Sequence, residues 1–160
     1  MVLAYERETS QSAKNAISQI LINSKMCALG KRPICQDTGI VNVFVEVGMS
    51  VEWDSELSLE DMINEGVRRA YNEPDNRLRA SIVSDPLFGR KNTQDNTPAV
   101  IHTKIVKGSK LDITVAAKGG GSENKSKFTV LNPDDSLTDW VLKTVPKMGA
   151  GWCPPGMIGI

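Results

Sequence analysis

The apolar residues between Thr9 and Leu29 recur every three or four positions, which is the spacing of one face of an α-helix. Thr9 or Ser10 can cap the start of this helix, and Gly30 can end it. The sequence therefore predicts a helix of several turns over this segment.

Two further helices are predicted from the residues at their ends. Ser58, with Asp61 three residues later, resembles a capping box that precedes an apolar face, and Pro74 closes this helix. Ser136 can cap a last helix, which Pro146 ends. Both segments are therefore expected to be short amphipathic helices.

Period-two alternation predicts the strands. After Gly39, valine occupies every second position from 41 to 47, which predicts a strand with one apolar face. The β-rich runs "AVIHTKIV" and "LDITVAA" are separated by "KGSK", a spacing typical of an antiparallel hairpin. The polar segment from Glu73 to Pro98 is long for a connection, and we place one short strand in it, near "RASIV". Helices packed around a mostly antiparallel sheet indicate an α+β fold.

Length and charge narrow the function classes. The 160 residues are enough for a single domain with one core. Nineteen basic residues balance nineteen acidic ones, so no net field attracts nucleic acid or an anionic membrane. The apolar runs fall well short of the roughly 20 residues of a membrane span. No secretory signal pattern opens the chain. We expect a cytoplasmic protein that binds neither nucleic acid nor membranes.

The chain has only three cysteines, and this small, odd number argues against a disulfide framework. Cys27 falls inside a helix pattern, which is typical of a small buried apolar residue. Cys35 and Cys153 fall in two loops, where thiolates can be presented to a soft metal such as the iron of a sulfide cluster. They are one or two ligands short of a full set, and they form no CxxC pair.

Two other features suit an anion. The run "KGGGSENKS" offers consecutive glycines after the cation Lys118, and their backbone N–H groups can approach a carboxylate or phosphate. Arg77 and Arg79 alternate along an extended stretch, so one guanidinium can face inward and bind a carboxylate with two hydrogen bonds. His102 is the sole histidine and lies within a predicted strand, which favours a structural role over catalysis.

Six segments follow one another along the chain: "KRPICQDTG", "NEGVRRAY", "PDNRLRAS", "NTPAVIH", "AAKGGGSENKSKF" and "MGAGWCPPGMIGI". Together they resemble the class I, iron–sulfur-dependent fumarases from Thr9 onward. The resemblance implies that residues 1–160 are a truncated part of the N-terminal, cluster-binding domain of a longer fumarase. It also implies a [4Fe-4S] cluster held by three cysteines, of which Cys35 and Cys153 match two. The third would lie beyond Ile160, in sequence leading into a C-terminal domain.

The resemblance further implies reversible hydration of fumarate to (S)-malate, with the open iron of the cluster as a Lewis acid. Asp37 is the candidate for orienting or transferring the proton, and a base from the missing domain is the alternative. A full-length enzyme of this family would typically be a homodimer. The residues implied to line the dicarboxylate site are Gln36, Asp37, Arg79, Lys118, Gly119, Gly120 and Gly121.

Two other interpretations stay open at this point. A related hydro-lyase acting on tartrate would need similar arginine and glycine contacts with two carboxylates. A non-catalytic anion-binding domain would use "KGGGS" as its whole site, with structural cysteines. Under the fumarase interpretation, we expect the 160 residues alone to be inactive and to hold little or no iron.

Overall fold

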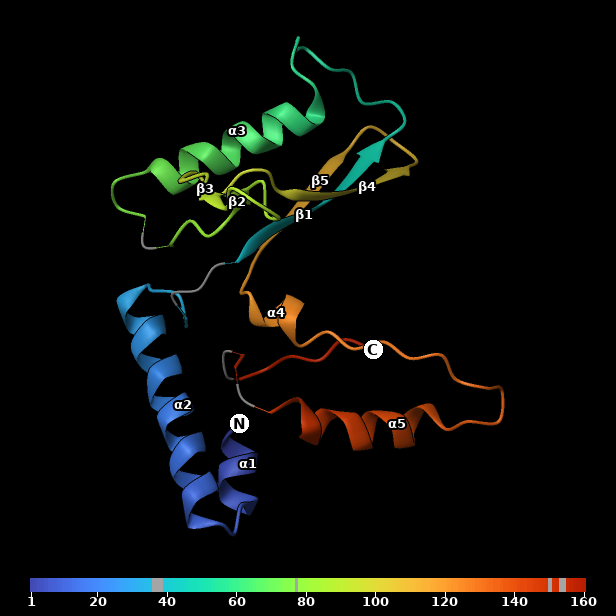
Figure 1. Ribbon diagram of the computed structural model, residues 1–160. Helices are drawn as coiled ribbons and strands as arrows, with labels where there is room; N and C mark the ends of the chain where they lie inside the picture. The colour runs from blue at the N-terminus through green and yellow to red at the C-terminus, as the bar shows by residue number, and fades with distance from the viewer. Residues whose placement is uncertain (36–38, 77, 150, 153–154) are drawn as a thin grey trace.

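The structure is a computed structural model that describes residues 1–35, 39–76, 78–149, 151–152 and 155–160. It combines helices with a small mixed sheet, so it is broadly α+β (Figure 1). The helical elements are α1 (Val2–Arg7), α2 (Gln11–Gly30), α3 (Leu59–Asn72), α4 (Gly121–Asn124), α5 (Leu137–Thr144) and the 3-10 turn η1 (Val145–Met148).

The predicted helix starts are confirmed by their caps. The Ser10 hydroxyl accepts from the backbone N–H of Ala13 at 3.5 Å, at the start of α2. At the start of α3, the Ser58 hydroxyl accepts from the N–H of Asp61 at 3.1 Å and donates to its carboxylate at 2.6 Å. Ser136 caps α5 in the same way, at 3.2 Å. In each cap, the serine oxygen satisfies a backbone N–H that the helix itself leaves without a partner.

The cap of α3 can be tested by mutation. We expect Ser58→Ala to lower the free energy of unfolding by about 1 kcal/mol, because the N–H of Asp61 loses its acceptor. Urea titration followed by circular dichroism measures the change. Ser58→Thr keeps the hydroxyl and is the matched control. Equal stability of the alanine and threonine variants would contradict a capping contribution.

The sheet has the order β4-β1-β5. Strand β1 (Ile40–Gly48) pairs in parallel with β4 (Val100–Val106) and antiparallel with β5 (Leu111–Lys118). The predicted hairpin between "AVIHTKIV" and "LDITVAA" is therefore wrong, since β1 lies between these two strands. The main sheet is mixed, where we expected it to be mostly antiparallel. A separate two-stranded ladder joins β2 (Val83–Ser84) and β3 (Lys91–Asn92), and β2 lies at the end of the predicted "RASIV" strand.

The backbone of the "KGSK" turn explains why the hairpin does not form. Gly48 donates its N–H to the carbonyl of Lys110 at 2.8 Å, and Ser50 donates to that of Gly108 at 2.9 Å. The turn thus binds the end of β1. A Cβ on Gly48 would lie 2.3 Å from the Gly108 oxygen, so glycine permits this approach. The turn spans β1 and leaves β4 and β5 on opposite sides of it.

The core lies on one face of β1. Its alternate valines are at most 7% exposed, and Val67 of α3 packs against them. The other face carries Phe44, whose ring stacks on His102 with centroids 4.9 Å apart. It also carries an ion pair of 2.7 Å between Glu46 and Lys104. The predicted two-faced strand is confirmed, and His102 is a partly exposed strand residue, as expected.

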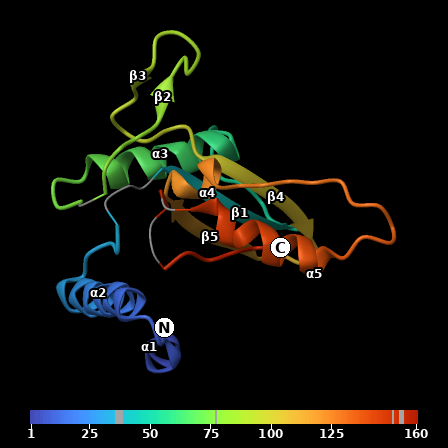
Figure 2. The ribbon, with the colours of Figure 1, turned by 60° about the horizontal axis from the view of Figure 1, so that its bottom comes forward.

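Helices α1 and α2 stand apart from the sheet and α3 in both ribbon views (Figures 1 and 2). Neither helix has a buried residue, and Met26 and Leu29 on α2 are 64% and 77% exposed. The helical period predicted for α2 is therefore correct, but its apolar residues do not join the core. Within the described residues, no helix has both the length and the apolar character needed to cross a bilayer.

Candidate functional site

The turn before β1 and the turn after β5 are brought together by the sheet. Their antiparallel register pairs Ile40 with Lys118, so the end of "PICQDTG" lies beside the start of "KGGGS" (Figure 1). Gly39 has a φ of 49°, and a Cβ there would lie 2.2 Å from the Lys118 carbonyl oxygen and 2.7 Å from the Gly120 nitrogen. A residue with any side chain would break this contact between two backbones. The two segments singled out in the sequence therefore meet at Gly39.

A third segment reaches the same place through Trp152. A Cβ on Gly121 would lie 2.7 Å from the Cβ of Trp152, so the C-terminal loop rests directly on the glycine run. The indole N–H of Trp152 donates to the carbonyl of Gly149 at 3.0 Å, which fixes the ring within its loop. Trp152 thereby brings its part of the C-terminal loop to the place where Gly39 meets the glycine run.

Ser81 and Asn96 attach a fourth segment to this junction. The carbonyl oxygen of Gly39 accepts from the Ser81 hydroxyl at 2.8 Å and from the Asn96 amide at 3.2 Å. Asn96 is fully buried, at 0% exposure. Sequence reasoning missed both residues. The available signal was the "DNTP" turn, where asparagine tolerates a left-handed backbone, and Asn96 indeed has a φ of 58°.

The structure describes some of the predicted substrate-binding residues and not others. Lys118 ends β5, Gly119 and Gly120 connect it to α4, and Gly121 begins that helix. The expected glycine loop is thus a short strand-to-helix connection. Gly119 to Gly121 are half-buried, whereas Lys118 and Arg79 are exposed cations. Gln36 and Asp37 lie outside the described residues.

The cysteines behave differently from one another. Cys35 is half-buried, four residues before Gly39. The single S–H of Cys27 has two acceptors within reach, the carbonyl of Pro33 at 3.3 Å and the side-chain oxygen of Asn23 at 3.5 Å, which agrees with a structural role. Cys153 lies outside the described residues. Among the residues that are described, no three metal-binding side chains gather in one group.

Ion pairs anchor the "DNTP" turn to α3. Arg68 donates to the Asp95 carboxylate at 3.1 Å, and the other Asp95 oxygen accepts from the N–H and the hydroxyl of Thr97. Burial alone would raise the pKa of Asp95, but the hydrogen bonds from Thr97 and the Arg68 guanidinium lower it overall. The Asp95 carboxylate therefore bonds to α3 through one oxygen and to Thr97 of its own turn through the other. These bonds hold the turn that carries Asn96.

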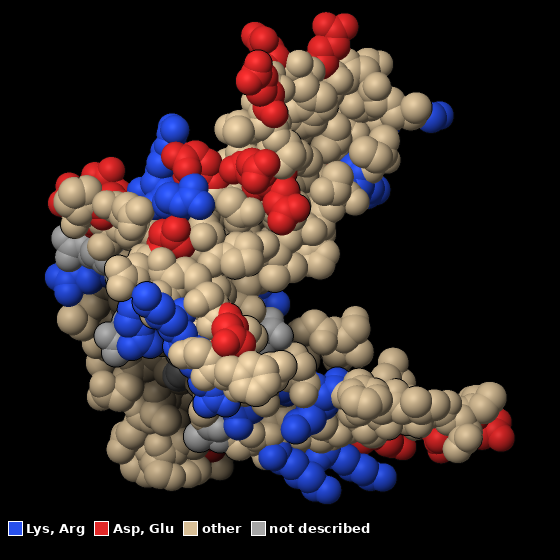
Figure 3. All heavy atoms as spheres, turned by 45° about the horizontal axis from the view of Figure 1, so that its top comes forward, with Lys and Arg blue, Asp and Glu red and all other residues tan. Residues whose placement is uncertain are grey.

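The surface charge is unevenly distributed around this region. Figure 3 shows Lys and Arg side chains gathered in the lower half of the face in view, while its upper half carries most of the acidic side chains. The sequence following β5 is basic, with Lys118, Lys125 and Lys127 within ten residues. Such a local cationic field attracts small anions even though the whole chain is neutral.

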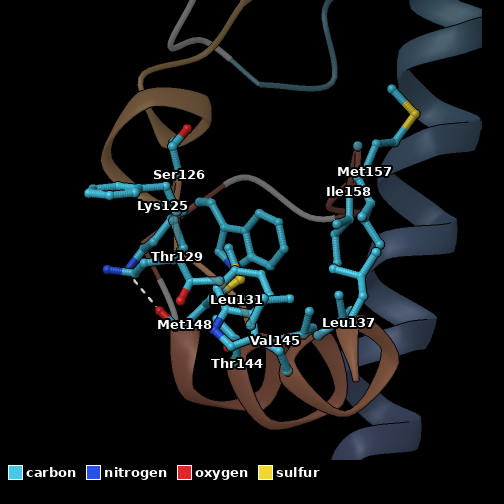
Figure 4. Close-up of a pocket in the computed structure, with 18 of the residues that line it drawn as sticks. Lys125, Ser126, Thr129, Leu131, Leu137, Thr144, Val145, Met148, Met157 and Ile158 are labelled. Carbon is cyan, nitrogen blue, oxygen red and sulfur yellow. Dashed lines mark hydrogen bonds between the residues drawn. The ribbon is translucent and has the colours of Figure 1, made fainter. Parts of the chain in front are cut away.

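A cavity of about 670 Å³ adjoins the junction, and Lys118, Gly121 and Trp152 form part of its wall. Figure 4 shows Leu131, Val145 and Ile158 among the apolar side chains around it. At one rim, Lys125 donates to the carbonyl of Met148 at 3.0 Å. Carboxylates need cations and N–H donors, and in this cavity wall such groups occur beside Lys118, whereas the interior is mostly apolar.

Comparisons with known proteins agree on one family. A family model described as Fumarate hydratase (Fumerase) matches residues 1–160. The chain is 32% identical, over 98% of its length, to a putative L(+)-tartrate dehydratase subunit alpha of Methanocaldococcus jannaschii, of which it covers 56%. It is 30% identical, over 96% of its length, to the anaerobic class I fumarate hydratase of Escherichia coli K12, of which it covers 28%. The chain thus spans about half, or less, of these relatives.

Proposed function

The chain belongs to the fumarate hydratase (Fumerase) family, and from this premise we propose that its parent protein is a hydro-lyase that acts on a small dicarboxylate. We take reversible hydration of fumarate to (S)-malate as its reaction. A tartrate dehydratase activity is the second candidate, because a relative named as a tartrate dehydratase subunit is covered over a larger share of its length than the fumarate hydratase.

The junction at Gly39 is the observation that carries this proposal. It unites the turn after Cys35, the glycine run after Lys118 and the loop that contains Trp152. These segments are far apart in the sequence, and they or their neighbouring residues supply what the reaction requires: thiols from Cys35 and Cys153, and the cation Lys118 before an anion-binding backbone. Their meeting at one point supports a shared site over three unrelated turns.

The polar residues have distinct proposed tasks. Lys118 and Arg79 supply positive charge for the two carboxylates, and the N–H groups of Gly119 to Gly121 stabilise the negative charge that develops on one of them. Removal of water from malate requires that a proton leave the carbon next to a carboxylate. We assign Asp37 to orient or transfer that proton, with Gln36 beside it on the substrate. A base outside this chain is the alternative.

The thiols of this chain fit part of a cluster site. Cys27 already has a structural role as a donor to Pro33, whereas half-buried Cys35 precedes the junction and Cys153 directly follows Trp152. We propose that Cys35 and Cys153 hold a [4Fe-4S] cluster together with a cysteine from outside this chain. When bound, the cluster would supply a Lewis acid for the hydroxyl and carboxylate of malate. We further propose that the parent enzyme, completed by a second domain, is a homodimer.

The test compares two cysteine variants of the full-length protein. After anaerobic reconstitution with iron and sulfide, we expect Cys35→Ser to lose nearly all fumarate hydration and most of the visible absorption of the cluster. Cys27→Ser is the matched control and should keep both, because the Cys27 thiol bonds to the carbonyl of Pro33 and a serine hydroxyl can replace it as donor. Iron content, absorption and malate formation are measured on the same samples.

The other outcomes each point elsewhere. Faster turnover of tartrate than of fumarate by the wild type would select the second candidate. Dicarboxylate binding without turnover, unchanged in both Cys35→Ser and Cys153→Ser, would instead support a non-catalytic anion-binding domain. Equal loss of the cluster in Cys27→Ser and Cys35→Ser would contradict the assignment of ligands.

A further inference from the structure

Among the described residues, two side chains donate hydrogen bonds to the carbonyl of Gly39, whose oxygen has two lone pairs to accept them. The Ser81 hydroxyl donates at 2.8 Å and the Asn96 amide at 3.2 Å. These donors come from positions 42 and 57 residues further along the chain. Gly39 is thus fixed by the long polar segment between α3 and β4.

Asn96 is itself held in place on its other side. Its side-chain oxygen accepts from the backbone N–H of Ser81 at 2.7 Å and from that of Ile82 at 3.1 Å. Asn96 therefore joins Gly39 to the strand-like segment that follows Arg79. The Asn96 side chain is 0% exposed, so water has little access to the atoms with which it makes these bonds.

The position of Gly39 determines that of the glycine run. A Cβ on Gly39 would overlap the backbone of Lys118, Gly119 and Gly120, so these backbones are already in direct contact. A shift of Gly39 away from Ser81 and Asn96 would open or compress this contact. Backbone donors bind a carboxylate well only when their geometry is fixed to a fraction of an ångström.

We propose that Ser81 and Asn96 are positioning residues for the dicarboxylate site: by holding the Gly39 carbonyl, they set the distance between Gly39 and the anion-binding glycine run that follows Lys118. This inference rests on the proposed function, since it assigns the two residues a role in substrate affinity. They act through Gly39 and need not touch the substrate.

The test uses Ser81 in the full-length enzyme, because its hydroxyl can be removed with little change in volume. We expect Ser81→Ala to raise the KM for fumarate about tenfold, the effect of losing one good hydrogen bond. The value of kcat per loaded cluster should change less than about twofold. Ser81→Thr restores the hydroxyl and should bring KM back to within about threefold of the wild type.

Ser84→Ala is the matched control. Ser84 lies on the same polar segment as Ser81, and its exposed hydroxyl donates to the backbone carbonyl of Lys91 at 3.1 Å in the β2–β3 ladder. A purely structural role for Ser81 would lower the amount of folded enzyme and leave KM unchanged. An unchanged KM in Ser81→Ala, no rescue by Ser81→Thr, or an equal rise in Ser84→Ala would each overturn the proposal.

Amide hydrogen exchange over residues 39–40 and 118–121 separates this proposal from the proposed function. We expect faster exchange there in Ser81→Ala and wild-type exchange in Ser84→Ala. A wild type that turns over neither fumarate nor tartrate would refute the proposed function, while exchange would still report on the link from Ser81 to the glycine run. Unchanged exchange in Ser81→Ala would refute that link even in an active enzyme.

Discussion

Gly39→Ala is expected to lower the free energy of unfolding by about 3 kcal/mol or more and to abolish the proposed activity. The residue sits at a φ of 49°, where a side chain costs about 1–2 kcal/mol. In addition, the new methyl group would lie 2.2 Å from a carbonyl oxygen of the backbone, which cannot rotate away as a side chain can. Forced overpacking of this kind adds about 1–3 kcal/mol. Urea unfolding of the variant measures the sum.

Gly108→Ala provides the control for this prediction. Gly108 also has a positive φ, of 101°, but no atom lies within 4 Å of the position of its Cβ. The control therefore carries backbone strain without a steric overlap. If both variants lose the same stability, the close approach of Gly39 to Lys118 has no energetic weight, and the junction is looser than the structure indicates.

Asn96→Leu is the second substitution with a large expected effect. Leucine has the same branching at Cγ but is larger, and it leaves the N–H groups of Ser81 and Ile82 without the acceptor that the buried Asn96 side chain supplies. Each buried donor without a partner costs about 1–3 kcal/mol, so we expect a loss of about 3 kcal/mol or more in the free energy of unfolding. Thermal and urea unfolding of the variant would measure it.

Asn92 is the matched control for Asn96, because it makes a similar bond on the exposed surface. Asn92 also bonds to the backbone, through its amide to Ala80 at 3.0 Å, but it is exposed. Water can replace that bond, so Asn92→Leu should cost less than about 1 kcal/mol. Equal losses at positions 92 and 96 would contradict the role assigned to burial.

The helices could be predicted because their signals are local. Ser10, Ser58 and Ser136 cap the helices that their sequence context indicates, since each cap depends on residues within one turn. The same holds for the valines of β1, which alternate over a single strand and are buried as expected. The local pattern does not reveal which helices contribute to the core. Met26 fits the apolar period of α2, yet it is exposed.

The strand order could not be predicted because it depends on distant residues. The spacing of "KGSK" is compatible with a hairpin, and only the tertiary structure shows that its carbonyls accept from the end of β1. The same limit applies to the site. The sequence identifies Lys118 and the glycine run as chemically suitable, but their contact with Gly39 follows from the antiparallel register of β1 and β5. Asn96 was missed because asparagine is common in polar turns.

Several assignments at the site remain predictions. Gln36, Asp37 and Cys153 lie outside the described residues, so the sequence resemblance alone supports their roles. Arg79 is an exposed cation in the segment that leads to Ser81. The described residues support the meeting of the loops, and the cysteine variants test the chemistry proposed for that place.

Because β1 is the central strand, the sheet cannot form during synthesis until β4 and β5 have been made. The partner residues of β1 follow much later: Glu46 pairs with Lys104, 58 residues further on, and with Asp112. Ribosomes add about 5–20 residues per second, so the valines of β1 emerge several seconds before either neighbouring strand exists. During this interval, α3 is the first structured element available to cover them. Chaperone capture of nascent chains should therefore be strongest for chains that end before β4.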